Sequence, residues 1–228
     1  MPLWSERRLC ALTLLLFLLI ALWDATGLDL ALARLFGSAQ GFAWRGQPGF
    51  SFWLHKVPRA ASGVAVAALA VGAVRPWGFL RGMAAGDRWL LLLSVVTAML
   101  AVALAKRASA TSCPWDLAGF GGAAPYVSHW SWGVRDHGPG HCFPAGHASA
   151  ALGYVAGWFV LRRAAPRVAG PWLAAALLLG GVLGWAQQMR GAHYLSHTLW
   201  SAWICWTVGL AMNFARRPEA EDTKLNTG

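Results

Sequence analysis

A short polar segment between two apolar runs carries the groups that could do chemistry. It spans residues 187–197, reads QQMRGAHYLSH, and places Arg190, His193 and His197 three and four residues apart. On a helix these spacings put side chains on one face, and a cation beside two imidazoles suits a phosphate group. Ionisable residues at a membrane boundary are costly unless they have a function. The alternative is a belt of polar side chains that snorkel to the interface.

The composition indicates that this segment belongs to a membrane protein. The chain has 228 residues, of which 57% are hydrophobic and only 12% are charged, whereas soluble domains have about 25% charged residues. Fifteen tryptophans fit this class, because indole rings favour membrane interfaces. The net charge of +10 lies mostly between apolar runs, which indicates orientation in a bilayer rather than a nucleic-acid partner. The four cysteines do not have the spacing of a zinc ribbon or a disulfide scaffold.

Six apolar runs predict an all-α, polytopic membrane protein, a bundle of six transmembrane helices that forms a single domain over residues 1–215. The first run is interpreted as an uncleaved span rather than a signal peptide, although it is shorter than the roughly 17–25 residues of a typical span. Residues 216–228 are polar and are predicted to be a disordered tail. The segments between the runs are predicted to be loops, including 37–56 and 108–143. The six runs are 9–23, 60–74, 89–105, 146–161, 168–187 and 198–215.

This topology brings separate polar clusters to one membrane face. Six spans put both termini on one side, and the arginines of the short loops 75–88 and 162–167 place that side in the cytoplasm by the positive-inside rule. Lys106 at the end of the third span, His147 at the start of the fourth and His193 before the sixth then share the outer face. We therefore expect a site that faces the periplasm or the extracellular side of a bacterial inner membrane.

Three segments at that face resemble the motifs of the type-2 phosphatidic acid phosphatase superfamily of membrane lipid phosphatases. Residues 106–114 read KRASATSCP, residues 143–148 read FPAGHA and residues 192–197 read AHYLSH. The family patterns are K-x6-R-P, P-S-G-H and S-R-x5-H-x3-D, and the resemblance extends over about residues 89–215. It implies hydrolysis of a phosphate monoester or diphosphate of a lipid through a phosphohistidine, without a metal or another cofactor.

All three motifs depart from the family pattern. Cys113 and Gln187 stand where the family has phosphate-binding arginines, Ala145 stands for the serine of the second motif, and His197 stands for the aspartate of the third. His197 could hold the neighbouring imidazole by a hydrogen bond, but it cannot supply the fixed negative charge of a carboxylate.

Other arginines could replace the two that are missing. Arg190 lies one helical turn after Gln187, so its guanidinium could reach the same phosphate, and Arg107 is a weaker candidate for the first motif. A guanidinium suits this task because its planar fork binds phosphate oxygens in pairs.

The resemblance assigns a role to each remaining residue. His193 occupies the nucleophile position, and His147 occupies the position of the general acid and base. Lys106 and Arg190 neutralise phosphate charge, and the backbone N–H groups around Gly146 add donors at a helix start.

Several alternatives stay open at this point. A lipid-to-lipid phosphotransferase would use the same residues, and a non-catalytic lipid-binding or transport protein could keep the scaffold. A zinc site is a third alternative because His193 and His197 are four residues apart, but the sequence offers neither the glutamate of a metalloprotease nor an obvious third ligand. The expected partners are the bilayer and a lipid phosphate. The oligomeric state is not predicted.

Two cysteines lie directly beside motifs. Cys113 precedes Pro114 in the first motif, and Cys142 precedes the FPAGHA segment. Both would face an oxidising compartment, in which disulfides persist. A bond between them would pin the first motif against the second, and the alternative is two free thiols.

Overall fold

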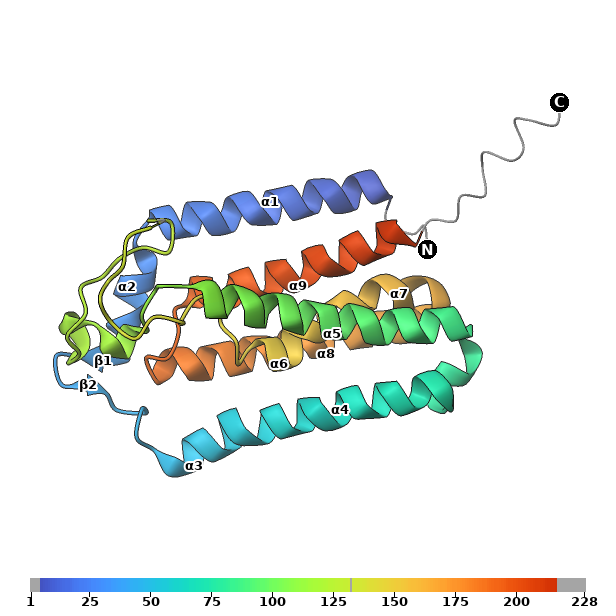
Figure 1. Cartoon of the computed structure of the whole chain (residues 1–228), viewed down its shortest axis with the longest axis horizontal. Helices are drawn as coiled ribbons and strands as arrows, with labels where there is room; N and C mark the ends of the chain where they lie inside the picture. Colours follow the sequence, from blue (N-terminus) through green and yellow to red (C-terminus); the bar gives the residue numbers. More distant parts are fainter. Residues whose placement is uncertain (1–4, 132, 217–228) are drawn as a thin grey trace.

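A computed structural model describes residues 5–131 and 133–216. The predicted helical class is confirmed in this part of the chain, where one hairpin of two-residue strands accompanies the helices. The predicted disorder of residues 216–228 falls almost entirely outside the described residues. Long helices lie lengthwise beside one another (Figure 1). They are α1 (Glu6–Ala25), α4 (Val57–Val74), α5 (Ala85–Ala108), α8 (Pro166–Met189) and α9 (Leu195–Ala215).

Four of the described helical segments are long and apolar enough to cross a membrane. They are Glu6–Ala25, Pro48–Gly82, Ala85–Ala108 and Pro166–Met189. Leu14, Leu18 and Leu22 of α1 are all more than half exposed, which suits a helix surrounded by lipid. A helix can cross the hydrocarbon region because it satisfies its own backbone hydrogen bonds. Helix α9 is not among these four, and several of its polar side chains are buried.

The inner helices approach one another closely through small residues. α9 packs against α1, α5 and the segment that follows α6. A Cβ at Gly209 of α9 would lie only 2.7 Å from the Cα of Ala156, so glycine is required for this contact. Small residues at helix interfaces are typical of membrane proteins, because association there depends on close packing.

The predicted fourth span, residues 146–161, is not one regular helix. It consists of α6 (Ser149–Leu152), a 3₁₀ turn (Gly153–Gly157) and α7 (Trp158–Ala164). The 3₁₀ turn packs against α5, where a Cβ at Gly157 would lie 2.7 Å from Leu91 Cδ1. Short 3₁₀ segments tighten a helix locally, and the apolar run alone does not reveal that change.

The predicted loop over residues 37–56 was wrong in its second half. After the hairpin of β1 (Gly37–Ser38) and β2 (Gly41–Phe42), α3 (Pro48–Ser51) and a π-helical turn (Phe52–Lys56) lead directly into α4. His55 is therefore helical rather than a loop residue. Pro48 at the first helical position favours this start, because its fixed φ suits the first turn.

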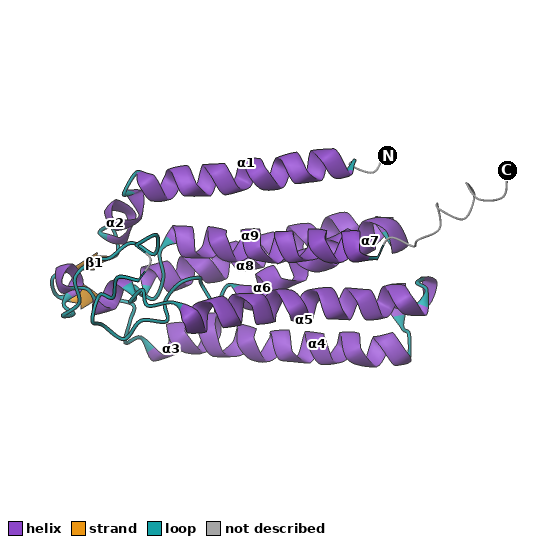
Figure 2. Ribbon diagram, turned by 45° about the horizontal axis from the view of Figure 1, so that its top comes forward, coloured by secondary structure: helices purple, strands orange, loops and turns teal. Residues whose placement is uncertain are grey.

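The irregular segments gather at one end of the bundle. The ends of α5 and α8, the start of α9, the hairpin and the 109–148 loop all lie at that end (Figures 1 and 2). The start of α1 and the end of α9 lie at the opposite end (Figure 1). The three motif segments are thus brought together at the end of the bundle away from both described chain ends.

Candidate active site

Backbone hydrogen bonds connect the three motif segments. Trp115 N–H donates to the Gly191 carbonyl at 3.0 Å, which joins the first segment to the third. Ala145 N–H donates to the His197 carbonyl at 3.0 Å, which joins the second to the third. Gly191 has φ +73°, a left-handed conformation that glycine adopts without cost, and it turns the chain from α8 towards His193. These hydrogen bonds therefore connect the three motif segments to one another.

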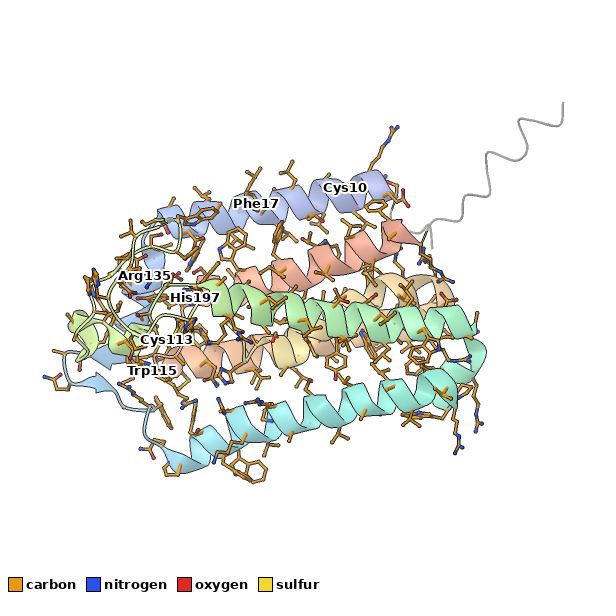
Figure 3. The ribbon with its side chains drawn as sticks, in the orientation of Figure 1. Cys10, Phe17, Cys113, Trp115, Arg135 and His197 are labelled. Atoms are coloured by element: carbon orange, nitrogen blue, oxygen red, sulfur yellow. A yellow bond between two sulfur atoms is a disulfide. The ribbon has the colours of Figure 1, made fainter. Side chains whose placement is uncertain are left out.

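The structure joins Cys113 and Cys142 in a disulfide, with their Cα atoms 5.1 Å apart. The bond connects the segment after α5 to the segment before the FPAGHA motif. Next to it, Cys142 N–H donates to the Thr111 carbonyl at 2.9 Å. Figure 3 shows Cys113 among the loops, near Trp115 and His197.

The two histidines at the catalytic positions of the family face each other. The ring centroids of His147 and His193 are 6.0 Å apart, although α6, α7 and α8 lie between these residues in sequence. His193 is 2% exposed. A phosphorus atom between two such rings could be approached by one imidazole and exchange a proton with the other, which is the geometry that the proposed roles require.

Burial and charge keep the His193 imidazole neutral. Burial lowers the pKa of His193 well below 6.5, and the neighbouring imidazoles of His197 and His147 and the positive charge of Lys106 lower it further. The backbone of Cys142 hydrogen-bonds the ring and opposes this shift. A neutral imidazole has a free lone pair at neutral pH, so His193 has the protonation state of a nucleophile.

Lys106 lies against the second motif. Its Nζ donates to the His141 carbonyl at 2.6 Å, and a Cβ at Gly146 would lie 2.9 Å from its Cδ. Glycine at position 146 thus makes room for the lysine beside His147. Gly146 does not begin a regular helix, because α6 starts only at Ser149, whose hydroxyl donates to the Gly146 carbonyl at 2.7 Å. The expected helix dipole at Gly146 is correspondingly weak, since four residues align few peptide dipoles.

Arg190 is held by the residue that replaces the family arginine. Its Nη1 donates to Gln187 Oε1 at 3.0 Å, and Gln187 Nε2 donates to the Leu54 carbonyl at 3.3 Å. The Nε of Arg190 is buried and has no hydrogen-bond partner within the described chain. A buried guanidinium with a free donor is able to accept an anion. Gln187 therefore connects Arg190 to the Leu54 backbone.

His197 lies beside His193 but does not replace the aspartate directly. The two ring centroids are 5.8 Å apart, and the backbone of Cys142 hydrogen-bonds both imidazoles. His197 is 1% exposed, and its Nδ1 has no hydrogen-bond partner among the described residues.

Arg107, the weaker candidate for the first-motif arginine, is exposed on the last turn of α5. Adjacent residues on an α-helix point about 100° apart. Because Lys106 faces Gly146, Arg107 is directed away from that contact.

Comparison with protein-family models shows to which family this chain belongs. The model described as PAP2 superfamily matches residues 87–218, more than half of the chain. The chain belongs to the PAP2 superfamily. Searches of curated proteins and of solved structures gave no match. The PAP2 superfamily consists generally of metal-independent phosphatases, and its matched region contains Lys106, His147, Arg190 and His193.

Two further histidines of this PAP2 protein were missed by the sequence reasoning. His55 in the π-helical turn lies against His147, with ring centroids 3.9 Å apart, and the Nδ1 atoms of both rings are buried without a hydrogen-bond partner in the described chain. His129 lies on the other side of the site, stacked on Phe143 at 4.0 Å and 5.8 Å from the His197 ring. These contacts extend the histidine pair into a row of five rings.

Two carboxylates near the start of the chain, Asp24 and Asp29, form hydrogen bonds with residues in or beside this row of rings. Asp24 accepts hydrogen bonds from His129 at 3.1 Å and from Trp200 at 2.8 Å. Asp29 accepts hydrogen bonds from the backbone N–H and the hydroxyl of Ser196, and so satisfies an otherwise unpaired N–H in the first turn of α9. Both carboxylates lie outside the PAP2 match, so no motif indicated them.

Proposed function

We propose that this chain is an integral membrane lipid phosphatase that hydrolyses a phosphate monoester or diphosphate of a lipid through a phosphohistidine. The observation that carries the proposal is the pairing of His147 and His193, 6.0 Å apart, with the charges of Lys106 and Arg190 acting on His147. Two imidazoles and two cations are sufficient for phosphoryl transfer without a resident metal, because the cations neutralise the charge on the equatorial oxygens.

In the first step, a ring nitrogen of His193 attacks phosphorus and forms a P–N bond as the P–O bond to the lipid breaks. His147 gives a proton to the departing oxygen, which leaves as a lipid alcohol or a lipid phosphate. Lys106 and Arg190 bind the remaining phosphoryl oxygens, which are held in place while the attacking and leaving groups stay in line.

In the second step, water replaces the lipid. His147 is now the base, and it takes a proton from water as the oxygen attacks phosphorus. The P–N bond breaks, inorganic phosphate is released and His193 regains its lone pair. The histidines finish the cycle in the states in which they began.

The proposed position in the membrane rests on the arrangement of the helices. Six spans, with the interrupted α6–α7 segment and α9 as the fourth and sixth, place the motif loops at the end opposite both described chain ends (Figure 1). The arginines of loops 75–88 and 162–167 lie at the chain-end side, which the positive-inside rule puts in the cytoplasm. The site then faces the periplasm or the outside of a bacterial inner membrane.

Labelling of single cysteines tests this orientation. In a Cys10→Ser background, we expect Ser131→Cys in the long loop to react with a membrane-impermeant maleimide in intact cells, and Arg167→Cys to react only after permeabilisation. Both positions are exposed, so accessibility in the folded protein is matched. The opposite labelling pattern would reverse the proposed topology.

A substrate panel tests the activity. We expect purified protein in detergent to release inorganic phosphate from at least one of phosphatidic acid, phosphatidylglycerophosphate, a polyprenyl diphosphate and a lipid A phosphate. Selectivity should depend on the 115–142 loop, which forms one wall of a cavity of about 300 Å³ that includes His129 and Phe143. Phosphate that appears only as a new phospholipid, when an acceptor lipid is added, would identify a phosphotransferase instead.

A further inference from the structure

A sulfur atom and two imidazoles form a buried cluster beside the disulfide. Sγ of Cys142 lies 3.5 Å from Nδ1 of His193, and a ring nitrogen of His197 completes a set of three ligand atoms within 4.8 Å of one another. All three residues are at most 2% exposed. The Nδ1 of His197 is buried and unpartnered within the described residues.

The separation of these atoms approaches that of zinc ligands. Zn–S bonds of about 2.3 Å and Zn–N bonds of about 2.0–2.1 Å put tetrahedral ligand atoms roughly 3.3–3.6 Å apart. The Cys142–His193 contact of 3.5 Å already has this value. A movement of about 1 Å would bring His197 into the same range, and one tetrahedral position would stay open for water or a phosphate oxygen.

The disulfide decides whether the sulfur can act as a ligand. The thiolate, not a disulfide sulfur, binds metal ions, and Cys142 is bonded to Cys113. A dithiol would reduce this bond, giving two cysteine thiols and one oxidised dithiol. The Cys142 thiol then loses its proton as the Zn–S bond forms. The thiolate charge also offsets the positive charge of Lys106, which acts on His193.

We propose that the reduced chain binds one zinc ion through Cys142, His193 and His197, and that the disulfide prevents this in the oxidised chain. Zinc bound there occupies the lone pair of His193. If the proposed phosphatase function is correct, zinc therefore inhibits the reduced enzyme and leaves the oxidised enzyme unaffected. Metal binding itself does not depend on that function.

Cobalt(II) is the probe for the site, because a cobalt–thiolate bond gives a charge-transfer absorption that histidine ligands do not. The experiment uses a Cys10→Ser background, since Cys10 is an exposed free thiol at the other end of the bundle (Figure 3). We expect Cys113→Ser, which frees Cys142, to bind one equivalent of cobalt with this absorption. The matched variant Cys113→Ser/Cys142→Ser also lacks the disulfide but should bind at least about 100-fold more weakly, because loss of even an outer-shell partner costs 10–100-fold.

The results separate the metal site from the phosphatase function. The proposal is supported by the cobalt–sulfur absorption in Cys113→Ser, whether or not any lipid phosphate is hydrolysed. It is overturned if folded Cys113→Ser gives no such absorption, or if the double variant binds equally well. Should Cys113→Ser fail to fold, the same measurement is made on the parent protein reduced with a trialkylphosphine, which takes up oxygen from water as it converts the disulfide to two thiols. Zinc inhibition of the reduced form, reversed by a chelator, is the expected effect on activity.

Discussion

Replacement of His193 by alanine should abolish turnover and prevent any covalent labelling of the protein by phosphorus-labelled substrate. The alanine variant lacks the nitrogen that forms the P–N bond, and loss of a nucleophile typically costs several orders of magnitude in rate. In the parent enzyme the trapped intermediate should be a phosphoramidate, which is labile in acid and stable in base. Quenching a labelled reaction in alkaline denaturant, followed by denaturing electrophoresis at alkaline pH, measures it.

The companion variant, His147→Ala, distinguishes the two histidines. It keeps the nucleophile, so it should still accumulate label, but it cannot protonate the departing oxygen. The loss should be about 10²–10⁴-fold with a lipid alkoxide leaving group and much smaller with a nitrophenolate, which departs without a proton. Residual turnover in His193→Ala comparable to that of the parent would refute the nucleophile assignment. Chelators should leave the oxidised enzyme unaffected, because Lys106 and Arg190 provide the positive charge.

The sequence predicted which candidate site residues lie together better than it predicted the contacts around them. The order of the apolar runs placed Lys106, His147 and His193 at one membrane face, and the resemblance to the family motifs selected them as candidate site residues. The structure places these residues together through backbone hydrogen bonds and the Cys113–Cys142 disulfide. The composition also predicted a membrane protein, because a chain with so few charged residues cannot cover its surface with polar side chains.

The contacts around these candidate residues could not be predicted from the sequence in the same way. His55 reaches His147 because a π-helical turn redirects the start of α4, and Asp24 reaches His129 across more than 100 residues. Such contacts depend on packing between elements, and hydrophobic periodicity describes one element at a time. Gln187 illustrates the same limit. In the sequence it indicated only the loss of a phosphate-binding arginine, whereas in the structure its two hydrogen bonds connect Arg190 to Leu54.

The second large effect is expected at Arg190. Arg190→Ala should lower kcat/KM by about 10²–10³-fold, the usual cost of removing one donor that stabilises transition-state charge. Arg190→Lys should recover little, because an ammonium group cannot bind two phosphate oxygens with a planar fork. Steady-state kinetics on the best substrate of the panel measures both, and size-exclusion chromatography in detergent checks that each variant is folded.

Two matched variants make this result specific. Arg45 also contacts Trp115, with its guanidinium 4.8 Å from the ring centroid compared with 5.8 Å for Arg190, but it is exposed. Arg45→Ala should therefore change the rate by less than about tenfold, since exposed charges contribute little. Gln187→Arg combined with Arg190→Ala restores the family arginine at its own position and should regain part of the lost activity. Near-normal activity of Arg190→Ala would mean that the phosphate is held by other groups. Failure of the double variant to exceed Arg190→Ala would mean that an arginine at position 187 does not reach the phosphate.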